Sequence, residues 1–502
     1  MADIKKYKYF HSNEWHEPIL NKWFNSENPA NGKVWATLPD CSKKDIDMAV
    51  QAAKKAFYDG PWGKLMPAER GRVLRKIGDV ICKNADRIGA IETRDNGKLP
   101  SQITPSLREG AWLLDSWYYY AGMCDKFEGK LIPAELPDMH NYMKWEPFGV
   151  VAQILPWNSP IGTLIWKLAP CLAAGNTVVL KPSEQASCSI LELMDILLDA
   201  DIPPGVLNVV TGYGHTTGEP LIDHPDVRMV SFTGGTNGGK AAAKIASQQV
   251  KPIVMELGGK SPQIVLPDAD IDLAVNGVAS GIFPAGGQSC ISGSRLLIHS
   301  SIIDEFTEQL VKVCKRATVG DPLQESTTIG PIANRVHYER ILDNIDKAQK
   351  EGHNLVLDGR NECRDNGFYI GPTIFKDVPN TTYLAQNEIF GPVVSTEKWD
   401  NEDEVIKTAN DTIFGLAAGI WSKDITKAMK IADNIEAGTI YINNYFNAAA
   451  QSPVGGYKQS GYGRENGWEG MRCFMQTKSV WLSTNPKPVS YTHLTLPTIC
   501  SV

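Results

Sequence analysis

Residues 228–239 read Arg-Met-Val-Ser-Phe-Thr-Gly-Gly-Thr-Asn-Gly-Gly. The first five positions form a short, mainly apolar run that predicts a buried strand, and an amphipathic helix is predicted after the glycines. A glycine-rich turn between a strand and a helix directs backbone N–H groups and the helix N-terminus towards one point, where a pyrophosphate can dock. The spacing, Gly234-x-Thr236-x-x-Gly239, differs from the common G-x-G-x-x-G pattern, and an ordinary tight turn explains it about equally well.

The same alternation of strand and helix extends on both sides of this turn. Apolar runs that predict strands lie at residues 150–155, 177–180, 206–210 and 253–255, and predicted helices lie at 190–198 and 240–246. After Cys290 the pattern resumes, with strands at 295–299, 419–422 and 439–443 and a helix at 303–315. Such alternation is typical of parallel sheets covered by helices, so we expect an α/β protein with a nucleotide-binding sheet and a second α/β domain.

The N-terminal segment reads as helical instead. Ser42 is placed to cap a helix over 45–57, where apolar residues recur at helical spacing. A second helix is expected after Pro67, and a third, rich in aromatic residues, over 106–121.

The composition is that of an ordinary globular protein. Of the 502 residues, 42% are hydrophobic and 21% charged, so two or three domains are expected. The net charge of −7 disfavours a nucleic-acid binder, which needs a basic face. Ten cysteines are scattered without a Cys-x-x-Cys or Cys/His cluster, so no metal site is predicted and the thiols suit a reducing, cytoplasmic compartment. We expect neither a signal peptide nor a membrane span, because prolines and polar residues interrupt the longest apolar stretch, 149–174.

Two glycine-flanked segments carry a carboxylate and a thiol. Glu256 lies in Met-Glu-Leu-Gly-Gly-Lys (255–260), and Cys290 ends Gly-Gly-Gln-Ser-Cys (286–290). A thiolate is a nucleophile that forms thioesters, and a carboxylate can activate the water that hydrolyses them. Taken singly, Cys290 would be a buried structural cysteine and Glu256 a surface carboxylate. The glycines and polar residues around both favour a catalytic pair.

Three further segments end predicted strands or mark sharp turns. Lys181 and Glu184, in Lys-Pro-Ser-Glu, are placed to bind ribose hydroxyls, although a solvated strand end is the simpler explanation of these two alone. Asn158 follows Pro-Trp and has an amide N–H suited to an oxyanion, yet a lone Asn is more often a turn residue. Glu388 and Phe390, in Glu-Ile-Phe-Gly-Pro, offer a carboxylate and a ring for a nicotinamide riboside, or a loop anchored by one Phe.

Together these segments resemble the NAD(P)-dependent aldehyde dehydrogenase superfamily, over about residues 20–482. Six motifs match in the order that the family has them, namely Ile154–Asn158, Lys181–Glu184, Met255–Pro262, Phe283–Cys290, Glu388–Pro392 and Gly455–Glu465. One such match can arise by chance, whereas six in order are not reasonably accidental. The resemblance implies an enzyme that oxidises a small-molecule aldehyde to the carboxylic acid.

The resemblance also implies a role for each matched position. Cys290 would attack the aldehyde, Asn158 would hold the oxyanion, and Glu256 would activate water against the thioester. Lys167 and Glu465 match positions that the family associates with a proton relay. The implied cofactor contacts are Trp157, Lys181, Glu184, Gly214, Phe232, Gly234, Thr236, Leu257, Glu388 and Phe390. A carboxylate at Glu184 accepts bonds from both ribose hydroxyls and repels a 2′-phosphate, so we expect NAD in preference to NADP.

The architecture implied by the resemblance has three parts. A Rossmann-like dinucleotide-binding domain would comprise 1–128 and 149–258, an α/β catalytic domain 259–470, and a small β oligomerisation extension 129–148 and 471–483, with a disordered or non-native tail at 484–502. The extension would pair with a neighbouring subunit in a homodimer or a homotetramer, and the sequence does not distinguish these two.

Two other functions fit parts of the pattern. A CoA-acylating enzyme would pass the acyl group to CoA instead of water, and Glu256 argues against it. A non-catalytic NAD-binding homologue would keep only the fold, and the intact set of Cys290, Glu256 and Asn158 argues against that. The aldehyde is not identified, because Ser159 and Val454 stand where the family more often has aromatic residues. Candidates for lining the substrate tunnel are Tyr118, Trp166, Tyr445 and Phe446.

Overall fold

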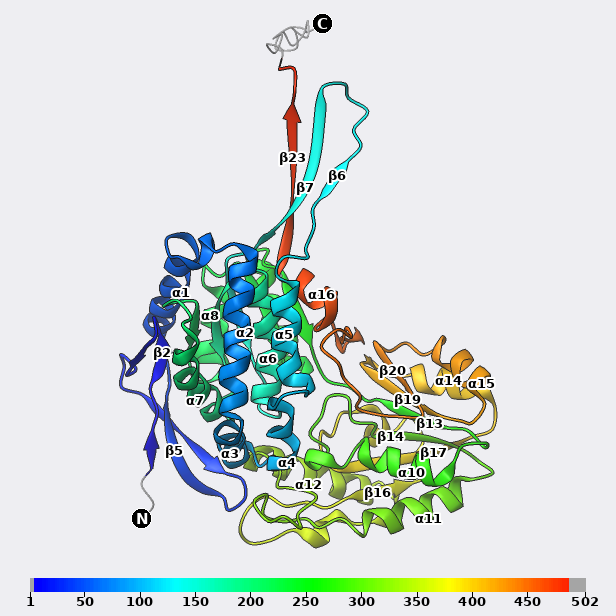
Figure 1. Cartoon of the computed structure of the whole chain (residues 1–502). Coiled ribbons are helices and arrows are strands. Elements are labelled where there is room, and N and C mark those ends of the chain that lie inside the picture. The colour runs from blue at the N-terminus through cyan, green and yellow to red at the C-terminus, as the bar shows by residue number, and fades with distance from the viewer. Residues whose placement is uncertain (1–3, 487–502) are drawn as a thin grey trace, which may run out of the picture.

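The computed structural model describes residues 4–486 of the chain. Figure 1 shows two α/β bodies and an arm of strands that projects from the first body. The first body holds an eight-stranded sheet, the second a seven-stranded sheet and the arm a three-stranded sheet. The predicted α/β fold class is therefore confirmed. None of the helices within residues 4–486 is long and apolar enough to cross a membrane.

The first sheet has the strand order β22–β12–β11–β8–β9–β10–β2–β3. Its central strands, from β12 to β10, run parallel, and antiparallel strands close both edges. The strands are β2 (Tyr9–His11), β3 (Glu14–His16), β8 (Val150–Ile154), β9 (Thr177–Lys181), β10 (Leu207–Val209), β11 (Met229–Thr233), β12 (Ile253–Glu256) and β22 (Gly461–Tyr462). The central strands lie where the apolar runs predict them.

Helices cover both faces of this sheet because its central strands are apolar on both sides. Val151 and Val178 point into one hydrophobic cluster, and their neighbours Val150 and Val179 point into the other. The helices are α1 (Lys43–Tyr58), α2 (Pro67–Lys83), α3 (Ala85–Asn96), α4 (Pro100–Ile103), α5 (Trp112–Met123), α6 (Pro160–Ala173), α7 (Cys188–Leu197), α8 (Glu219–Asp223) and α9 (Thr236–Gln248).

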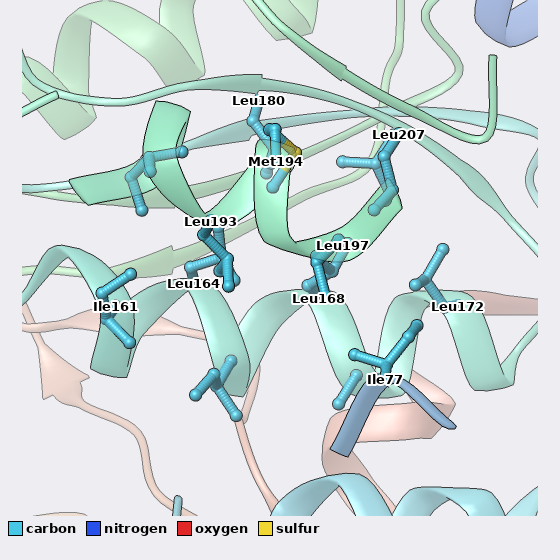
Figure 2. Packing of buried hydrophobic residues seen from close by; sticks show 14 of the residues in the cluster. Ile77, Ile161, Leu164, Leu168, Leu172, Leu180, Leu193, Met194, Leu197 and Leu207 are labelled. Atoms are coloured by element: carbon cyan, nitrogen blue, oxygen red, sulfur yellow. The ribbon is translucent and has the colours of Figure 1, made fainter. Parts of the chain in front are cut away.

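The packing of α6 against α7 fixes the positions of two predicted site residues, Lys167 within α6 and Asn158 just before it. Figure 2 shows Leu164 and Leu168 of α6 in one cluster with Leu193 and Leu197 of α7. All four side chains are buried. Since α6 begins directly after Asn158 and contains Lys167, this core determines where both side chains lie.

The second body repeats the α/β plan. Its sheet has the order β15–β16–β17–β14–β13–β19–β20. The strands are β13 (Pro262–Val265), β14 (Arg295–His299), β15 (Asn354–Leu357), β16 (Thr373–Lys376), β17 (Val393–Trp399), β19 (Ala417–Trp421) and β20 (Thr439–Ile442), with β18 (Phe414–Gly415) and β21 (Tyr457–Lys458) as a separate pair. The helices are α10 (Ile271–Ser280), α11 (Ile303–Cys314), α12 (Arg335–Lys350), α13 (Tyr383–Gln386), α14 (Glu402–Asn410) and α15 (Ile425–Ala432).

The arm is formed by β6 (Lys130–Ile132), β7 (Met139–Pro147) and β23 (Met475–Ser483), and α16 (Gly467–Arg472) leads into β23. All nine residues of β23 pair with β7, so β23 is an edge strand of the arm (Figure 1). Past β23, the Thr484 N–H still donates to the Asp138 carbonyl at 2.8 Å. The remainder of the predicted tail, 487–502, lies outside the described residues.

Two local expectations are wrong. Before the first helix, the chain forms strands: β2 and β3 join the first sheet, and β1 (Lys5–Lys6), β4 (Trp23–Asn28) and β5 (Lys33–Pro39) make a small sheet of their own. The third helix starts at Trp112 instead of 106, because Gly110 has a φ of +75° that breaks a helix there. Near the C-terminal end of the described residues, the strand β22 pairs with β12 of the first sheet.

Candidate active site

The loop after β12 brings Glu256 and Cys290 together. Glu256 is the last residue of β12, and Cys290 follows a short turn, η5 (Pro284–Gly287). A Cβ on Gly259 would lie 2.4 Å from the Cys290 carbonyl oxygen, so only glycine lets this loop lie against the cysteine backbone. Burial, followed by the charges of Glu388 and Glu256, raises the pKa of the Cys290 thiol to about 12. The thiol therefore needs a nearby base to become a nucleophile.

Glu256 has the environment of a general base. The side chain is buried, and its Oε1 atom has no hydrogen-bond partner among the described residues. Burial and the charge of Glu465 raise the pKa of Glu256 well above its ordinary value, and Lys167 opposes this effect. A carboxyl group with a raised pKa accepts a proton more readily than a surface carboxylate does.

Lys167 and Glu465 form a buried ion pair beside Glu256. Lys167 has no exposed side-chain surface, and its ammonium also donates to Ser231 Oγ at 3.0 Å. Ser231 lies in β11 and Lys167 in α6, whereas Glu465 comes from the segment after β22. Glu256, Lys167 and Glu465, which the sequence associates with proton transfer, thus lie in one cluster, although they derive from distant parts of the chain.

Asn158 is held against the cysteine loop. Its Nδ2 atom donates to the Gln288 carbonyl oxygen at 2.9 Å. The side chain of Gln288 is anchored in turn, because its Oε1 accepts from the Ala333 N–H at 2.9 Å and its Nε2 donates to the Ala285 carbonyl at 2.8 Å. Gln288 therefore positions Asn158. In the sequence it is visible only as a neighbour of Cys290. Its place beside Ser289 and Cys290 was the available signal.

The turn between β11 and α9 fits a bound phosphate group. Gly235 is the N-cap of α9, and space is open where a Cβ on it would lie. The hydroxyl oxygens of Thr233 and Thr236 are buried without hydrogen-bond partners among the described residues. Two unpaired donors at a helix N-terminus suit an anion. The Phe232 ring packs beneath this turn, 3.0 Å from where a Gly234 Cβ would stand.

Lys181 and Glu184 lie together at the end of β9. The Lys181 ammonium is 3.5 Å from Glu184 Oε2 and donates to the Pro182 carbonyl at 3.0 Å. Burial lowers the pKa of Lys181, and the charge of Glu184 opposes this effect. Gly214 opens the turn η4 (Gly214–Gly218), whose last residue packs against the Lys181 stem. Glu184 stays partly exposed, as a ligand-binding carboxylate must be.

Glu388 is fixed by the loop that follows Glu256. Its Oε1 accepts from the Gly259 N–H at 2.9 Å, and burial raises its pKa to about 7. A Cβ on Gly258 would lie 2.2 Å from Glu388 Oε2, so the glycine pair makes room for this carboxylate. Leu257 packs under α9 against Gly239, and its N–H donates to the Ser460 carbonyl at 2.9 Å.

Phe390 forms an aromatic group with Trp157 and His337. The Phe390 and Trp157 rings are 5.3 Å apart, and His337 lies 4.9 Å from Trp157. His337 Nε2 donates to the Phe390 carbonyl at 2.6 Å and so holds this residue at its unusual φ of +60°. Burial lowers the pKa of His337 to about 4, which keeps the ring neutral. His337 was not foreseen, because nothing around it in the sequence marks it.

The candidate tunnel residues separate into two groups. The Tyr445 hydroxyl donates to the Ile291 carbonyl at 2.8 Å, directly beside Cys290, and Phe446 packs on Tyr445. Trp166 lies 5.1 Å from Trp112 of α5. Tyr118 does not belong with them, since its hydroxyl donates to Asp79 at 2.8 Å between α5 and α2.

Comparison with known proteins agrees with this fold. A sequence model of the aldehyde dehydrogenase family matches residues 15–480. Human aldehyde dehydrogenase 1A1 is 40% identical over 486 residues, which cover 96% of each chain. The hamster (Mesocricetus auratus) mitochondrial aldehyde dehydrogenase is 40% identical over 480 residues, which cover 95% of each chain.

Two solved structures superpose closely on the chain. One is betaine aldehyde dehydrogenase from Staphylococcus aureus in complex with NAD+, with a TM-score of 0.94, 36% identity and 96% coverage of each chain. The other is an NAD+ complex of aldehyde dehydrogenase from Bacillus cereus, with a TM-score of 0.93, 37% identity and coverage of 95% of this chain and 97% of that chain.

The chain belongs to the aldehyde dehydrogenase family. The predicted family, the Rossmann-like dinucleotide-binding body joined to an α/β body, and the enzyme class are thereby confirmed. The roles of single residues and the domain boundaries stay predictions.

Proposed function

We propose that the protein oxidises a small aldehyde to the carboxylic acid with NAD, through a thioester on Cys290. The observation that carries this proposal is Glu256, a buried carboxylate with an unpaired oxygen and a raised pKa, placed beside the Cys290 loop. A family member that transfers its acyl group to water requires such a base next to the thioester. Family membership supports the aldehyde as substrate.

The first half of the reaction forms the thioester. Cys290 loses its proton to a carboxylate, and Glu256, whose charge already acts on the thiol, is available for this. The thiolate sulfur adds to the carbonyl carbon, and the π electrons of the carbonyl move to oxygen. Asn158 Nδ2 and the Cys290 backbone N–H would hold this oxyanion. NAD+ supplies the acceptor for the hydride that leaves the same carbon as the carbonyl re-forms.

The second half releases the acid. Glu256 first releases the proton that it took from Cys290. It then removes a proton from water, whose oxygen attacks the thioester carbon, and the carbon–sulfur bond breaks to regenerate the Cys290 thiolate. The proton passes from Glu256 towards the Lys167–Glu465 pair, which is hydrogen-bonded and buried. The raised pKa of Glu256 suits this step, because the group must first accept and then release a proton.

The chain's own residues provide the cofactor site. The unpaired hydroxyls of Thr233 and Thr236 and the N-terminus of α9 would bind the pyrophosphate. Lys181 and Glu184 would bind the adenosine ribose, and Glu388 with Phe390 would bind the nicotinamide end. The solved structures of similar proteins contain NAD+, which supports the same dinucleotide here.

Glu184 gives the preference for NAD over NADP. We predict that Glu184→Ser raises the NADP-to-NAD ratio of kcat/KM at least about tenfold, because a 2′-phosphate no longer meets a carboxylate. The two ratios come from steady-state rates with each dinucleotide. Glu219→Ser, a surface change on nearby α8, is the control. An unchanged ratio in Glu184→Ser would remove the basis of this preference.

The arm and the cysteines support a cytoplasmic homo-oligomer. The edge strand β23 exposes Trp481 and Leu482, which a second copy of the chain would cover by continuing the sheet. The nine cysteines within residues 4–486 are all free thiols, as expected in a reducing compartment. The only partners that the proposal needs are an aldehyde, NAD and further copies of the chain, and neither a nucleic acid nor a membrane has a part in it.

Trapping the intermediate tests the central claim. The Glu256→Gln variant is mixed with NAD and an aldehyde, quenched in acid, digested and analysed by mass spectrometry. We expect the acyl mass on the peptide that contains Cys290, and its loss in a Cys290→Ser background. Cys82→Ser, a half-buried cysteine of α2, is the matched control and should retain the adduct. An adduct on another side chain, or aldehyde oxidation without any adduct, would overturn the proposal.

A further inference from the structure

A partly accessible stripe on α6 leads to Asn158. Every residue of α6 is buried except Trp166. Ser159, the N-cap of α6, is also partly accessible and precedes Trp166 by two helical turns, so both lie on one face. Trp166 in turn contacts Trp112, which is likewise partly accessible. Ser159, Trp166 and Trp112 therefore form a stripe of partly accessible side chains that begins next to Asn158.

A cation lies at the end of this stripe that is next to Asn158. Lys98 Nζ donates to Ser159 Oγ at 2.6 Å, next to the predicted oxyanion donor. The hydroxyl of Ser159 accepts this bond and keeps its own proton free to donate. The other end of the stripe, at Trp112 and Trp166, is aromatic. The polar groups of the stripe are therefore concentrated beside Asn158.

Lys98 is held rigidly relative to Cys290. It lies in a loop in which Gly97 has a φ of +78° and packs so closely on Pro331 that a Cβ would lie 2.6 Å from the proline ring. The backbone N–H of Lys98 donates to Asn96 Oδ1 at 3.0 Å. Gln288, which positions Asn158, also reaches the Pro331 carbonyl at 3.5 Å. The same contacts therefore fix the cysteine loop, Asn158 and Lys98.

The charge of Lys98 is only partly compensated. Burial lowers the pKa of Lys98, although the carboxylate of Glu92 acts to raise it. Glu92 is itself engaged, since its Oε2 accepts the Ile161 N–H at 3.1 Å, and burial raises its pKa to about 6. An anionic group on a ligand would add the compensation that Glu92 does not provide.

We propose that Lys98 and Ser159 form the recognition site for a carboxylate on the substrate, so that the preferred aldehydes are short oxo acids. The carboxylate would accept from the Lys98 ammonium and the Ser159 hydroxyl while the aldehyde carbon lies at Cys290. This inference rests on the proposed function and adds its substrate class.

The test compares two substrates of similar shape within each variant. Succinic semialdehyde carries a carboxylate, and 4-methylpentanal has an isopropyl group in its place. The measured quantity is the ratio of their kcat/KM values. We expect Lys98→Met to lower this ratio at least about tenfold, mainly through the KM of the oxo acid, because a charged hydrogen bond is lost. Lys98→Arg should keep most of the ratio, and Ser159→Ala should lower it by a smaller factor.

A change in the opposite direction makes the test sharper. Glu92→Gln keeps the acceptor for the Ile161 N–H but removes the competing charge, so it should raise the ratio. Lys350→Met, at the exposed end of α12, is the control and should leave the ratio unchanged. Since the ratio is taken within one preparation, partial unfolding cancels, and Ser159→Ala with Glu92→Gln decides the matter if Lys98→Met does not fold.

Two results would count against different claims. If Lys98→Met and Glu92→Gln both leave the ratio within about twofold of the parent, carboxylate recognition by Lys98 is wrong even though the protein oxidises aldehydes. If the parent oxidises neither substrate nor any other aldehyde with NAD, the proposed function itself fails.

Discussion

The side-chain amide of Asn158 uses only one of its two N–H groups in a hydrogen bond. A side-chain amide carries two N–H groups, and one of those on Asn158 is given to the Gln288 carbonyl. That bond orients the amide and leaves the second N–H to meet an oxyanion at Cys290. The structure therefore supports a role that the sequence could only suggest, since a lone Asn in a turn is common.

Removing this amide gives a prediction for the rate. Asn158→Ala should lower kcat about a hundredfold, because one oxyanion donor typically contributes ~3 kcal/mol. The dissociation constant for NAD, measured by fluorescence titration, should stay nearly unchanged. Asn158→Asp, which keeps the size but introduces a charge, should be at least as slow. Equal kcat values in the alanine variant and the parent would refute the role.

Glu256 gives a prediction for pH dependence. Its pKa is raised above the ordinary value, so the carboxylate form becomes populated only as the pH rises towards that higher pKa. The rate of thioester hydrolysis, followed in single-turnover experiments, should therefore increase with pH in the parent. Glu256→Gln should be slow at every pH and should lose this increase. A variant that keeps the parental pH profile would show that another group is the base.

The predictability of the site residues depends on their local sequence. Glu256 ends a predicted strand, and both Glu256 and Cys290 are flanked by glycines, and those features are visible without a structure. Gln288 and Lys98 act through contacts with segments that lie far away in the chain, and His337 sits in an ordinary helix. Pairings across such distances have no local pattern, which is why the sequence did not reveal them.

At the scale of single elements, the hairpin of β2 and β3 shows why short strands were missed. Its two-residue turn is Ser12-Asn13, and both residues have a positive φ. Asn-Gly or Asp-Gly is the usual sign of such a turn, and Ser-Asn is a weaker one. The strands are three residues each and are stabilised by pairing with β10, which lies far along the chain. The central strands are mainly apolar and buried, and they needed no such context.

This hairpin also contains a stacked histidine pair that predicts acid sensitivity. The rings of His11 and His16 are 3.8 Å apart and nearly parallel, and burial lowers the pKa of His11 to about 4. The folded state binds fewer protons than the unfolded state, whose histidines have a pKa near 6.5, so stability is lost as the pH falls below about 6.5.

Replacing His11 should remove part of this loss. We expect the Tm of His11→Phe to fall less than that of the parent between about pH 7 and about pH 5, because phenylalanine packs in the same place without titrating. His140→Gln, an exposed histidine of the arm, should follow the parent. Parallel curves of Tm against pH for His11→Phe and the parent would contradict the assignment.

At the scale of the whole molecule, the arm is the part that the body does not cover. β23 pairs with β7 along its full length and leaves its other edge free, with Trp481 58% exposed. A long edge strand with exposed apolar side chains such as Trp481 and Leu482 invites pairing with another chain. The family resemblance implies a β extension at 129–148 and 471–483, and this division of the chain stays a prediction.

Disrupting this edge should change the molecular mass in solution. Trp481→Arg is expected to shift the protein to a smaller species, measured by light scattering after size exclusion, because an arginine is poorly buried between two copies. Leu323→Arg changes a still more exposed apolar residue of the second body and should leave the mass unaltered. The same mass for Trp481→Arg and the parent would place the contact elsewhere.

The pairing of β22 with β12 has a consequence for biosynthesis. Lys167 is buried in the first body, but its carboxylate partner, Glu465, arrives only with the segment that follows β22. A ribosome must therefore translate nearly all of the message before that charge is neutralised. A prematurely terminated chain lacks this carboxylate, so only the charge of Glu256 opposes the buried ammonium, and the less stable chain is more open to chaperones and proteases.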